Sequence, residues 1–384
     1  MTPAARVQAA IEILDAVIES ARDNGPPADA LVRDYFRTRR YAGSKDRRAV
    51  REHVFGAIRL LGERPANGRE AMLALVGPEL FDGSAHGPAP VSEGEIAPEP
   101  TAIPAWIADE LSTLIDDRDA LLERAPLDLR VHAIKGDRAT LASELDGEPT
   151  PHSPWGLRLP ADTRIDDLPA YRSGIVEVQD EGSQLIALAC EPRAGETVLD
   201  LCAGAGGKAL ALAAMEPGAR LIASDVDRRR LSQFAPRAER AGAEIEALLL
   251  DPPREAEGLL ELHGQCDLVL VDAPCSGAGT WRRNPEGRWR LTPARLDALT
   301  QLQERVLDLG AACVKPGGRL VFATCSILTR EGAGQIESFL SRHSDFVSDN
   351  VLEFVGRKSG QGRLLTPGHD GTDGFFIARL RRSC

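Results

Sequence analysis

Long apolar runs are missing from this chain of 384 residues. No stretch approaches the roughly 18 consecutive apolar residues that identify a membrane-spanning helix, and the first ten residues lack the apolar core of a secretory signal. CxxC pairs are missing as well, and the seven cysteines, an odd number, all lie between Cys190 and Cys384. These absences argue against a membrane protein, a secreted disulfide framework and a zinc ribbon. We therefore expect no metal site and a location in the reducing cytoplasm.

The chain also lacks an overall positive charge. Its formal net charge is −12, which by itself disfavours a nucleic-acid partner. Local basic patches matter more for phosphate binding than the net charge, however. Between Asp34 and Arg51 seven basic residues accompany two acidic ones, and between Trp281 and Arg295 five arginines accompany Glu286 alone. Each segment is either a nucleic-acid surface or an ordinary solvated helix face.

Apolar spacing divides the chain into a helical first part and an α/β second part. Between Ala4 and Ala21, and again between Val50 and Leu61, apolar residues recur every three or four positions, which predicts amphipathic helices. Residues 77–103 contain many prolines, glycines and acids without periodicity, which is typical of a linker. We therefore expect an all-helical domain over residues 1–76, a linker over 77–103, a small α/β connector over 104–178 and a last domain over 179–384.

Strand and helix patterns alternate from Glu196 onward. Strands are predicted at Thr197–Leu201, Arg220–Ser224, Glu246–Leu250, Asp267–Val271, Arg319–Thr324 and Phe375–Leu380. Helical stretches such as Arg228–Ala241 and Pro293–Val314 lie between most of these strands. This alternation predicts a mainly parallel sheet with helices on both faces.

A glycine-rich turn follows the first of these strands and opens a helix. The turn consists of Cys202, Ala203, Gly204, Ala205, Gly206, Gly207 and Lys208. Glycines let the backbone approach a ligand closely, and a helix N-terminus offers unpaired N–H groups. The glycine spacing fits neither the dinucleotide fingerprint nor the Walker A phosphate loop.

Two aspartates stand at the tips of the next two strands. Asp225 is suited to hydrogen bonding with ribose hydroxyls, and Asp251 to accepting a hydrogen bond from an adenine amino group. Either residue can instead be a turn former, the usual role of aspartate at strand ends. Together with the glycine-rich turn they favour S-adenosylmethionine as the cofactor, since this molecule carries a nucleoside but no phosphate.

Two cysteines follow the fourth and fifth strands. Cys275 lies in Asp272-Ala-Pro-Cys-Ser-Gly, and Cys325 lies in Thr-Cys-Ser. The carboxyl ends of neighbouring parallel strands line one crevice, so we expect both thiols beside the cofactor. The remaining cysteines of this region, Cys190, Cys266 and Cys313, are expected to be buried and inert.

These motifs resemble those of the RsmB (Sun/Fmu) family of RNA cytosine-carbon-5 methyltransferases. The similarity lies in the segments Asp200–Lys208, Asp272–Gly277, Thr324–Ser326, Val178–Gln184 and Asp373–Phe376. Residues 1–75 resemble the NusB-like RNA-binding domain that bacterial members carry. The resemblance implies a Rossmann-like class I methyltransferase domain, preceded by an all-α NusB-like domain and the small α/β connector.

The chain departs from the family pattern in the cofactor turn. The family usually reads Cys-Ala-Ala-Pro-Gly-Gly-Lys-Thr, whereas here Gly204 replaces the second alanine, Ala205 the proline and Ala209 the threonine. The first two changes loosen the turn and the third removes a hydroxyl that could cap the helix. Because the Gly-Gly-Lys core is intact, we expect the turn to bind S-adenosylmethionine.

The resemblance also implies an activity. The expected reaction is methyl transfer from S-adenosylmethionine to carbon 5 of a cytosine in RNA, with 16S ribosomal RNA favoured over transfer RNA. Cys325 is implied as the nucleophile that adds to carbon 6, Cys275 as the group that assists product release, and Asp272 as a partner of the cytosine ring. Cys275 is the rival nucleophile, because DNA cytosine methyltransferases use the cysteine of a Pro-Cys motif.

The reacting base must leave its stack to reach such a crevice. Trp281 and Trp289, interleaved with arginines, can stack on bases while the arginines bind phosphates. The alternative is a folded loop whose tryptophans pack inward. A non-catalytic RNA-binding assembly factor is a further alternative for the whole chain. No obligate protein partner and no membrane partner is expected.

Overall fold

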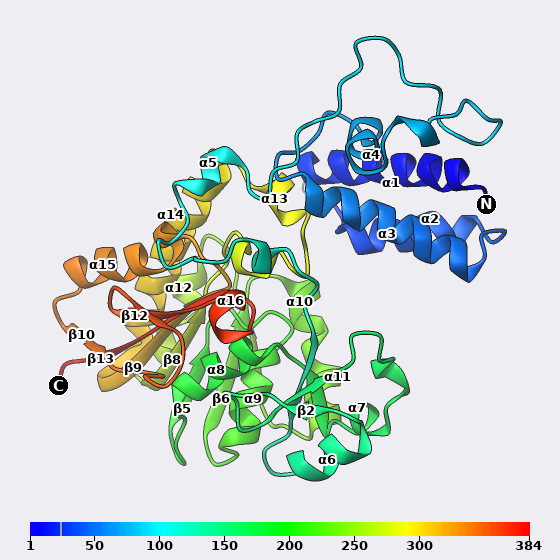
Figure 1. The fold of residues 1–384 in the computed structure, drawn as a ribbon. Helices are drawn as coiled ribbons and strands as arrows, with labels where there is room; N and C mark the ends of the chain where they lie inside the picture. The colour runs from blue at the N-terminus through cyan, green and yellow to red at the C-terminus, as the bar shows by residue number, and fades with distance from the viewer. Residues whose placement is uncertain (24) are drawn as a thin grey trace. The chain divides into compact units, whose positions relative to one another are not determined.

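The computed structural model describes residues 1–23 and 25–384, which form two compact units (Figure 1). The first unit comprises Met1–Leu111, Asp117–Glu123 and Thr280–Pro293. The second comprises Ser112–Asp116, Arg124–Gly279 and Ala294–Cys384. No helix in these described ranges is long and apolar enough to cross a membrane.

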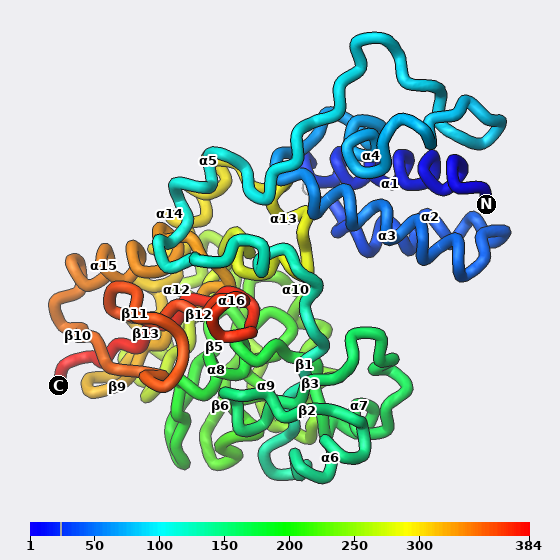
Figure 2. The backbone as a smooth tube through the Cα atoms, in the orientation of Figure 1, coloured from blue at the N-terminus to red at the C-terminus, as the bar shows by residue number. Residues whose placement is uncertain are grey.

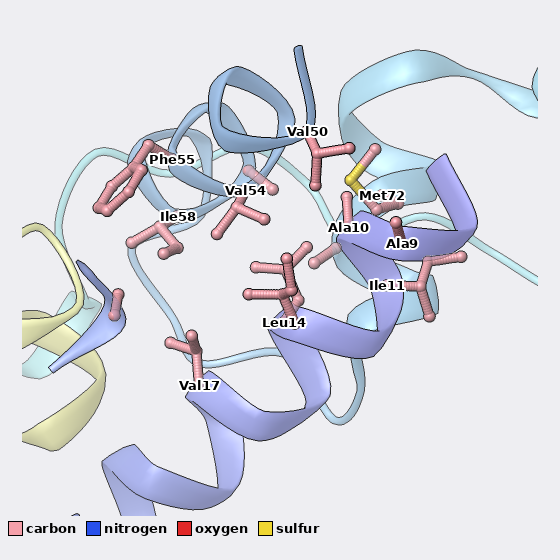
Figure 3. Packing of buried hydrophobic residues seen from close by; sticks show 14 of the residues in the cluster. Ala9, Ala10, Ile11, Leu14, Val17, Val50, Val54, Phe55, Ile58 and Met72 are labelled. Atoms are coloured by element: carbon pink, nitrogen blue, oxygen red, sulfur yellow. The ribbon is translucent and has the colours of Figure 1, made fainter. Parts of the chain in front are cut away.

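Helices build the first unit. They are α1 (Pro3–Asp23), α2 (Ala28–Thr38), α3 (Ser44–Leu60), α4 (Gly68–Val76) and the short α5 (Ala105–Ala108), with η1 (Pro78–Leu80) and η2 (Asp119–Leu121). The apolar positions of α1 and α3 face each other, so Leu14 and Val17 pack near Val54 and Ile58 in one core (Figure 3). Helix α4 lies close to α1 because its first residue is glycine; a Cβ on Gly68 would overlap the carbonyl oxygen of Ile11. The two amphipathic helices predicted from the sequence are therefore present.

Residues 77–103 are not the linker that we expected. Phe81 is buried in the core of the first unit, and the guanidinium of Arg69 on α4 binds Glu95 with an Nε–Oε1 distance of 2.6 Å. The Thr101 N–H donates to the carbonyl of Leu60 over 3.1 Å. The segment has the composition of a linker, but Phe81, Glu95 and the backbone of Thr101 each have a partner on the helices. The first unit thus extends well beyond residue 76.

The arginine–tryptophan segment folds into the first unit as α13 (Gly287–Arg290). Trp281 is 1% exposed and Trp289 is 2% exposed, and Trp289 Nε1 donates to the carbonyl of Leu61 over 2.8 Å. The Arg288 guanidinium donates to the carbonyls of Ile58 and Ala102, and burial lowers its pKa to about 10. The expectation that these tryptophans stack on RNA bases is wrong, and the inward-packing alternative is correct.

A nine-stranded sheet forms the centre of the second unit, in the order β11-β12-β13-β9-β8-β5-β6-β7 with β10 paired to β13. The parallel strands are β5 (Thr197–Asp200), β6 (Arg220–Asp225), β7 (Glu246–Leu249), β8 (Cys266–Asp272) and β9 (Val314–Thr324). The antiparallel edge is made by β10 (Phe346–Asp349), β11 (Arg357–Ser359), β12 (Gly362–Leu365) and β13 (Phe375–Arg382). All six predicted strands are present.

Helices cover both faces of this sheet (Figure 2). They are α8 (Glu181–Cys190), α9 (Gly207–Met215), α10 (Arg228–Ser232), α11 (Phe234–Ala241), α12 (Glu255–Gly258), α14 (Pro293–Cys313), α15 (Ala333–Arg342) and α16 (Pro367–Asp370), with the 3-10 turns η4 (Leu260–Leu262), η5 (Ala278–Thr280) and η6 (Thr329–Glu331). Successive side chains of a strand point to opposite faces. Leu268 and Leu270 of β8 accordingly pack with α8, whereas Val269 and Val271 lie against Gly310 of α14.

A second, four-stranded antiparallel sheet precedes the large one in the chain. Its order is β2-β3-β1-β4, built from β1 (Leu127–Val131), β2 (Glu148–Pro149), β3 (Gly156–Leu159) and β4 (Val176–Val178), with α6 (Arg138–Glu144), η3 (Ile165–Asp167) and α7 (Pro169–Arg172). The buried Asp128 binds Arg158 within this sheet at 2.7 Å. Glu181 of α8 accepts the Ser153 N–H at 2.7 Å. Such buried contacts make the small sheet part of the second unit.

Candidate active site

The cofactor turn connects β5 to α9, and two of its glycines are required by the backbone. Gly206 has φ +82° and Gly204 has φ +57°, a left-handed conformation that is costly for residues with a Cβ. A Cβ on Gly206 would also overlap the ring of Phe234, and one on Gly204 would overlap the guanidinium of Arg230. Gly204, the departure from the family pattern, thus fits a tight turn here.

Asp225 fastens this turn from the tip of β6. Its Oδ2 accepts the Gly204 N–H and its Oδ1 accepts the Asp227 N–H, each over 2.7 Å. The side chain of Asp251, beyond β7, is 70% exposed and pairs with Arg254. The structure therefore brings Asp225 into the turn and leaves Asp251 at an open strand tip.

Asp200, at the end of β5, is a candidate that our sequence analysis did not select. It is 1% exposed, and neither carboxylate oxygen has a hydrogen-bond partner among residues 1–23 and 25–384. Burial, reinforced by the nearby Asp272 carboxylate, raises the pKa of Asp200 to about 7. A carboxylate buried without a partner is costly unless a ligand pairs with it. Its signals in the sequence were its place at the end of a run of apolar strand residues and at the start of the family-like segment Asp200–Lys208.

Lys208 and Asp272 form an ion pair beside Asp200. Lys208 Nζ lies 2.6 Å from Asp272 Oδ2. Burial opposes the charge of Lys208, but the Asp272 carboxylate outweighs it and raises the pKa of Lys208. The lysine of the turn is thus a fixed cation that holds Asp272 in place.

The two cysteines of the strand tips lie side by side. Cys275 Sγ is 3.3 Å from Cys325 Sγ, and neither cysteine is in a disulfide. The contact follows from the parallel pairing of β8 with β9, which sets Asp272 opposite Ala323. The Gly279 N–H donates to the carbonyl of Cys325 over 3.0 Å, which folds the turn after Cys275 over the second cysteine.

The surroundings of Cys275 and Cys202 favour the protonated forms of these two thiols. The hydrogen bond with Cys325, together with burial, raises the pKa of Cys275 well above its usual range. Burial likewise raises the pKa of Cys202. Cys275 therefore remains a thiol near neutral pH and can donate its proton toward the sulfur of Cys325. Within the described ranges no group of three His, Cys, Asp or Glu side chains could hold a metal ion.

A second overlooked residue is Glu331, at the end of η6. It is completely buried and accepts hydrogen bonds from the serines that follow the two cysteines, Ser276 and Ser326. No spacing rule connects an acid to a cysteine six residues earlier, so the sequence offered no signal for it.

Comparison with known proteins identifies this arrangement. Residues 187–381, which contain the cofactor turn and both strand-tip cysteines, match the family model described as 16S rRNA methyltransferase RsmB/F. A relative from Xylella fastidiosa, named Ribosomal RNA small subunit methyltransferase B, is 36% identical over 292 residues, which cover 73% of this chain and 68% of the relative. A relative of the same name from Pasteurella multocida is 33% identical over 293 residues, 73% of this chain and 66% of the relative. The chain belongs to the RsmB/F family.

This RsmB/F member is thus an S-adenosylmethionine-dependent rRNA methyltransferase. The chain spans about two thirds of the length of these curated relatives. Family membership confirms the resemblance stated from the motifs and goes against the alternative of a non-catalytic assembly factor.

Solved structures show the same fold. The protein PH0851 has a TM-score of 0.78 at 23% identity, over 98% of this chain and 99% of that chain. A methyltransferase homolog protein from Pyrococcus horikoshii has a TM-score of 0.62 at 26% identity, over 72% of this chain and 94% of that chain. The expected combination of helical and Rossmann-like parts is confirmed, whereas the NusB-like character of the first unit stays a prediction.

Proposed function

We propose that this enzyme methylates carbon 5 of a cytosine in 16S ribosomal RNA through a covalent bond between Cys325 and the base. The observation that carries the proposal is the 3.3 Å contact between the sulfurs of Cys275 and Cys325. Carbon 5 of cytosine is a poor nucleophile because the ring is aromatic. A thiolate that adds to carbon 6 removes this aromaticity and makes carbon 5 able to attack a methyl group, so covalent catalysis divides one difficult step into two.

Two neighbouring thiols support two successive roles. Cys275 keeps its proton because of the Cys325 contact and burial, so its S–H can stabilise a thiolate on Cys325. After methyl transfer, a base such as water takes the proton from carbon 5, the Cys325–carbon 6 bond breaks, and the aromatic ring returns. Cys275 is suited to assist that elimination, because its S–H can hydrogen-bond the Cys325 thiolate as it leaves.

The residues around the cofactor turn fit S-adenosylmethionine. The buried carboxylate of Asp200 would accept hydrogen bonds from the ammonium group of the methionine part, while Asp225 would hold ribose hydroxyls and Asp251 the adenine amino group. The turn from Cys202 to Lys208 would supply backbone contacts. When bound, this cofactor supplies an electrophilic methyl group on a sulfonium.

Asp272 would orient the target base. Its Oδ2 is held by Lys208, and the carboxylate can accept from the cytosine amino group and from N3 once that nitrogen is protonated. Because Lys208 holds this carboxylate in place, Asp272 can stabilise the ring as charge develops in the adduct.

The first unit would bind the RNA backbone. Exposed cations surround the turn between α2 and α3, namely Arg37, Arg40, Lys45, Arg47, Arg48 and Arg51. Several of them pair with acids, as Arg51 does with Asp29 at 2.6 Å, but such surface pairs are weak and phosphates can replace them. We assign this basic surface to ribosomal RNA, in keeping with the NusB-like resemblance.

Bisulfite sequencing of 16S rRNA tests the whole proposal. In a strain that lacks this gene one cytosine should lose its methylation, and the wild-type gene should restore it, whereas a gene carrying Cys325→Ala should not. Unchanged methylation of 16S rRNA combined with a lost site in transfer RNA would instead establish the alternative substrate.

A further inference from the structure

Glu331 is a fully buried carboxylate surrounded by neutral donors. Its Oε1 accepts the Ser276 N–H over 2.8 Å and Gln303 Nε2 over 2.9 Å. Its Oε2 accepts the hydroxyls of Ser326, over 2.6 Å, and of Ser276. Burying a carboxylate is strongly unfavourable unless hydrogen bonds replace the lost water. Four donors from three separate segments meet this need, so the carboxylate fixes these segments relative to one another.

The segments that Glu331 joins are the two cysteine turns. Ser276 directly follows Cys275, Ser326 directly follows Cys325, and their hydroxyl oxygens lie 3.4 Å apart. Each serine also accepts a backbone N–H of its own turn, from Ala278 over 3.2 Å and from Leu328 over 3.1 Å. We call Glu331, Ser276, Ser326 and Gln303 the glutamate clamp.

The backbone of Glu331 secures one of these turns a second time. Its carbonyl accepts the Thr324 hydroxyl over 3.1 Å, immediately before Cys325. Cys325 is thus flanked on both sides by side chains that bind the same residue. Gln303 also donates to the carbonyl of Pro274, immediately before Cys275, over 2.9 Å. The clamp therefore holds each cysteine from the residue before it and the residue after it.

We propose that Glu331 is a positioning residue that sets the spacing and orientation of the two thiols. This inference rests on the proposed roles of Cys325 and Cys275. The Ser326 branch holds the cysteine that forms the covalent bond, and the Ser276 branch holds the cysteine that acts after methyl transfer. Loss of the two branches must therefore affect different steps, which a purely stabilising network would not do.

Single-turnover methylation with adduct analysis tests this division. The variants are Ser326→Ala, Ser276→Ala and Glu331→Gln, and Glu337→Gln, an exposed acid on the next helix, is the matched control. We expect Ser326→Ala to slow adduct formation by about tenfold or more, the scale for losing a hydrogen bond to a charged group. Ser276→Ala should form the adduct at the normal rate but release it slowly, so that a protein–RNA band accumulates on a denaturing gel.

Glu331→Gln should show both defects at once. An amide presents an N–H₂ group where the carboxylate accepted, so it meets the serine or Gln303 donors with another donor. S-adenosylmethionine affinity and melting temperature, measured on the same preparations, check that each variant is folded. If Glu331→Gln does not fold, the two serine variants decide the question.

Two outcomes would overturn the inference in distinguishable ways. If wild-type enzyme forms the adduct and both serine variants form and release it at the wild-type rates or with equal losses, the clamp has no positioning role. If wild-type enzyme methylates the RNA without any adduct, the proposed cysteine chemistry fails and the inference falls with it.

Discussion

The carboxylates of the candidate site differ in their hydrogen-bond and ion-pair partners. Asp225 accepts one backbone N–H on each oxygen, Asp272 is paired with Lys208, and Asp200 is buried with no hydrogen-bond partner among the residues that the structure describes. Burying an unpaired carboxylate destabilises the free enzyme, but pairing with a cationic group of a bound ligand would offset this cost. The proposed role of Asp200 therefore predicts a connection between the stability of the protein and its cofactor affinity.

The first prediction concerns Asp200 and pH. The pKa of Asp200 is about 7 in the folded protein and about 4 in the unfolded chain. Protonated Asp200 therefore stabilises the fold fully below about pH 4, and this contribution to the free energy of unfolding is lost as the pH rises through about 7. Asp200→Asn should therefore raise the melting temperature of the cofactor-free protein at about pH 8. It should also weaken S-adenosylmethionine binding.

Calorimetry on the wild type provides the complementary measurement. If ionised Asp200 binds the cofactor, the affinity should fall about tenfold between pH 8 and pH 6, and the Asn variant should lose this dependence. A pH-dependent affinity that persists in Asp200→Asn would assign the titration to another group.

The second prediction separates the two thiols by what accumulates. Cys325→Ala should abolish both methylation and the RNA adduct, because no covalent bond can form without the nucleophile. Cys275→Ala should stall as a nuclease-sensitive adduct on a denaturing gel, because it acts after that bond exists. Adduct in Cys325→Ala and none in Cys275→Ala would exchange the two roles. Cys190→Ala, a buried thiol of α8, is the control for cysteine replacement itself.

At the scale of elements, the site is a set of strand tips joined by tight turns. Parallel pairing brings the ends of β5, β6, β8 and β9 to one edge of the sheet. Each turn then has its own fixing group, Asp225 for the cofactor turn and Glu331 for the two cysteine turns.

The third prediction compares two adjacent glycines of the cofactor turn. Gly206→Ala should destabilise the protein by about 1–3 kcal/mol, since it forces a left-handed residue against the ring of Phe234. Gly207→Ala should leave the stability of the cofactor-free protein nearly unchanged, because a Cβ there meets nothing within 4 Å. Denaturant unfolding of both variants checks this. Equal losses would mean that the turn is less tightly held than its contacts indicate.

Sequence patterns predicted the strands that alternate with helices and missed the short strands outside this alternation. The six predicted strands belong to a βα alternation with long apolar runs, whereas β10, β11 and β12 are three or four residues each and lie on the antiparallel edge. The cysteines could be placed together because strand order brings neighbouring tips into contact. Glu331 and the packing of Trp289 depend on contacts between segments far apart in the chain, which no local spacing encodes.

At the scale of the whole molecule, the residues proposed to bind RNA and those proposed to bind the cofactor lie in different units. The basic surface at the α2–α3 turn lies in the first unit, and the cysteines and the cofactor turn lie in the second. RNA affinity and cofactor affinity should therefore respond to different substitutions.

The fourth prediction uses this separation. Replacing Arg40, Lys45 and Arg48 with glutamine should weaken RNA binding and reduce the slope of log affinity against log salt by about 2, since each lost phosphate contact accounts for about 0.7–0.9. S-adenosylmethionine affinity should not change. The control replaces three exposed arginines of the second unit, Arg164, Arg172 and Arg193. If the salt dependence of the Arg40, Lys45 and Arg48 variant is unchanged, these residues do not contact RNA and form an ordinary solvated helix face.

The fifth prediction concerns the core of the first unit. Trp289→Ala should cost about 3–5 kcal/mol, the range for removing a large buried aromatic side chain. Thermal unfolding followed by circular dichroism measures the loss, and Trp106→Ala, at a half-buried tryptophan of the same unit, should cost less. A loss no larger than that of Trp106→Ala would mean that Trp289 is peripheral to this core.

The return of residues 280–293 to the helical unit has a consequence for biosynthesis. Domains usually fold in the order in which they leave the ribosome. Here the first helices emerge early, but their core lacks Trp289 and the carbonyls of Ile58 and Leu61 lack their donors until residue 289 has been made. The core of the N-terminal unit is therefore complete only after residues 124–279 of the second unit have been synthesised.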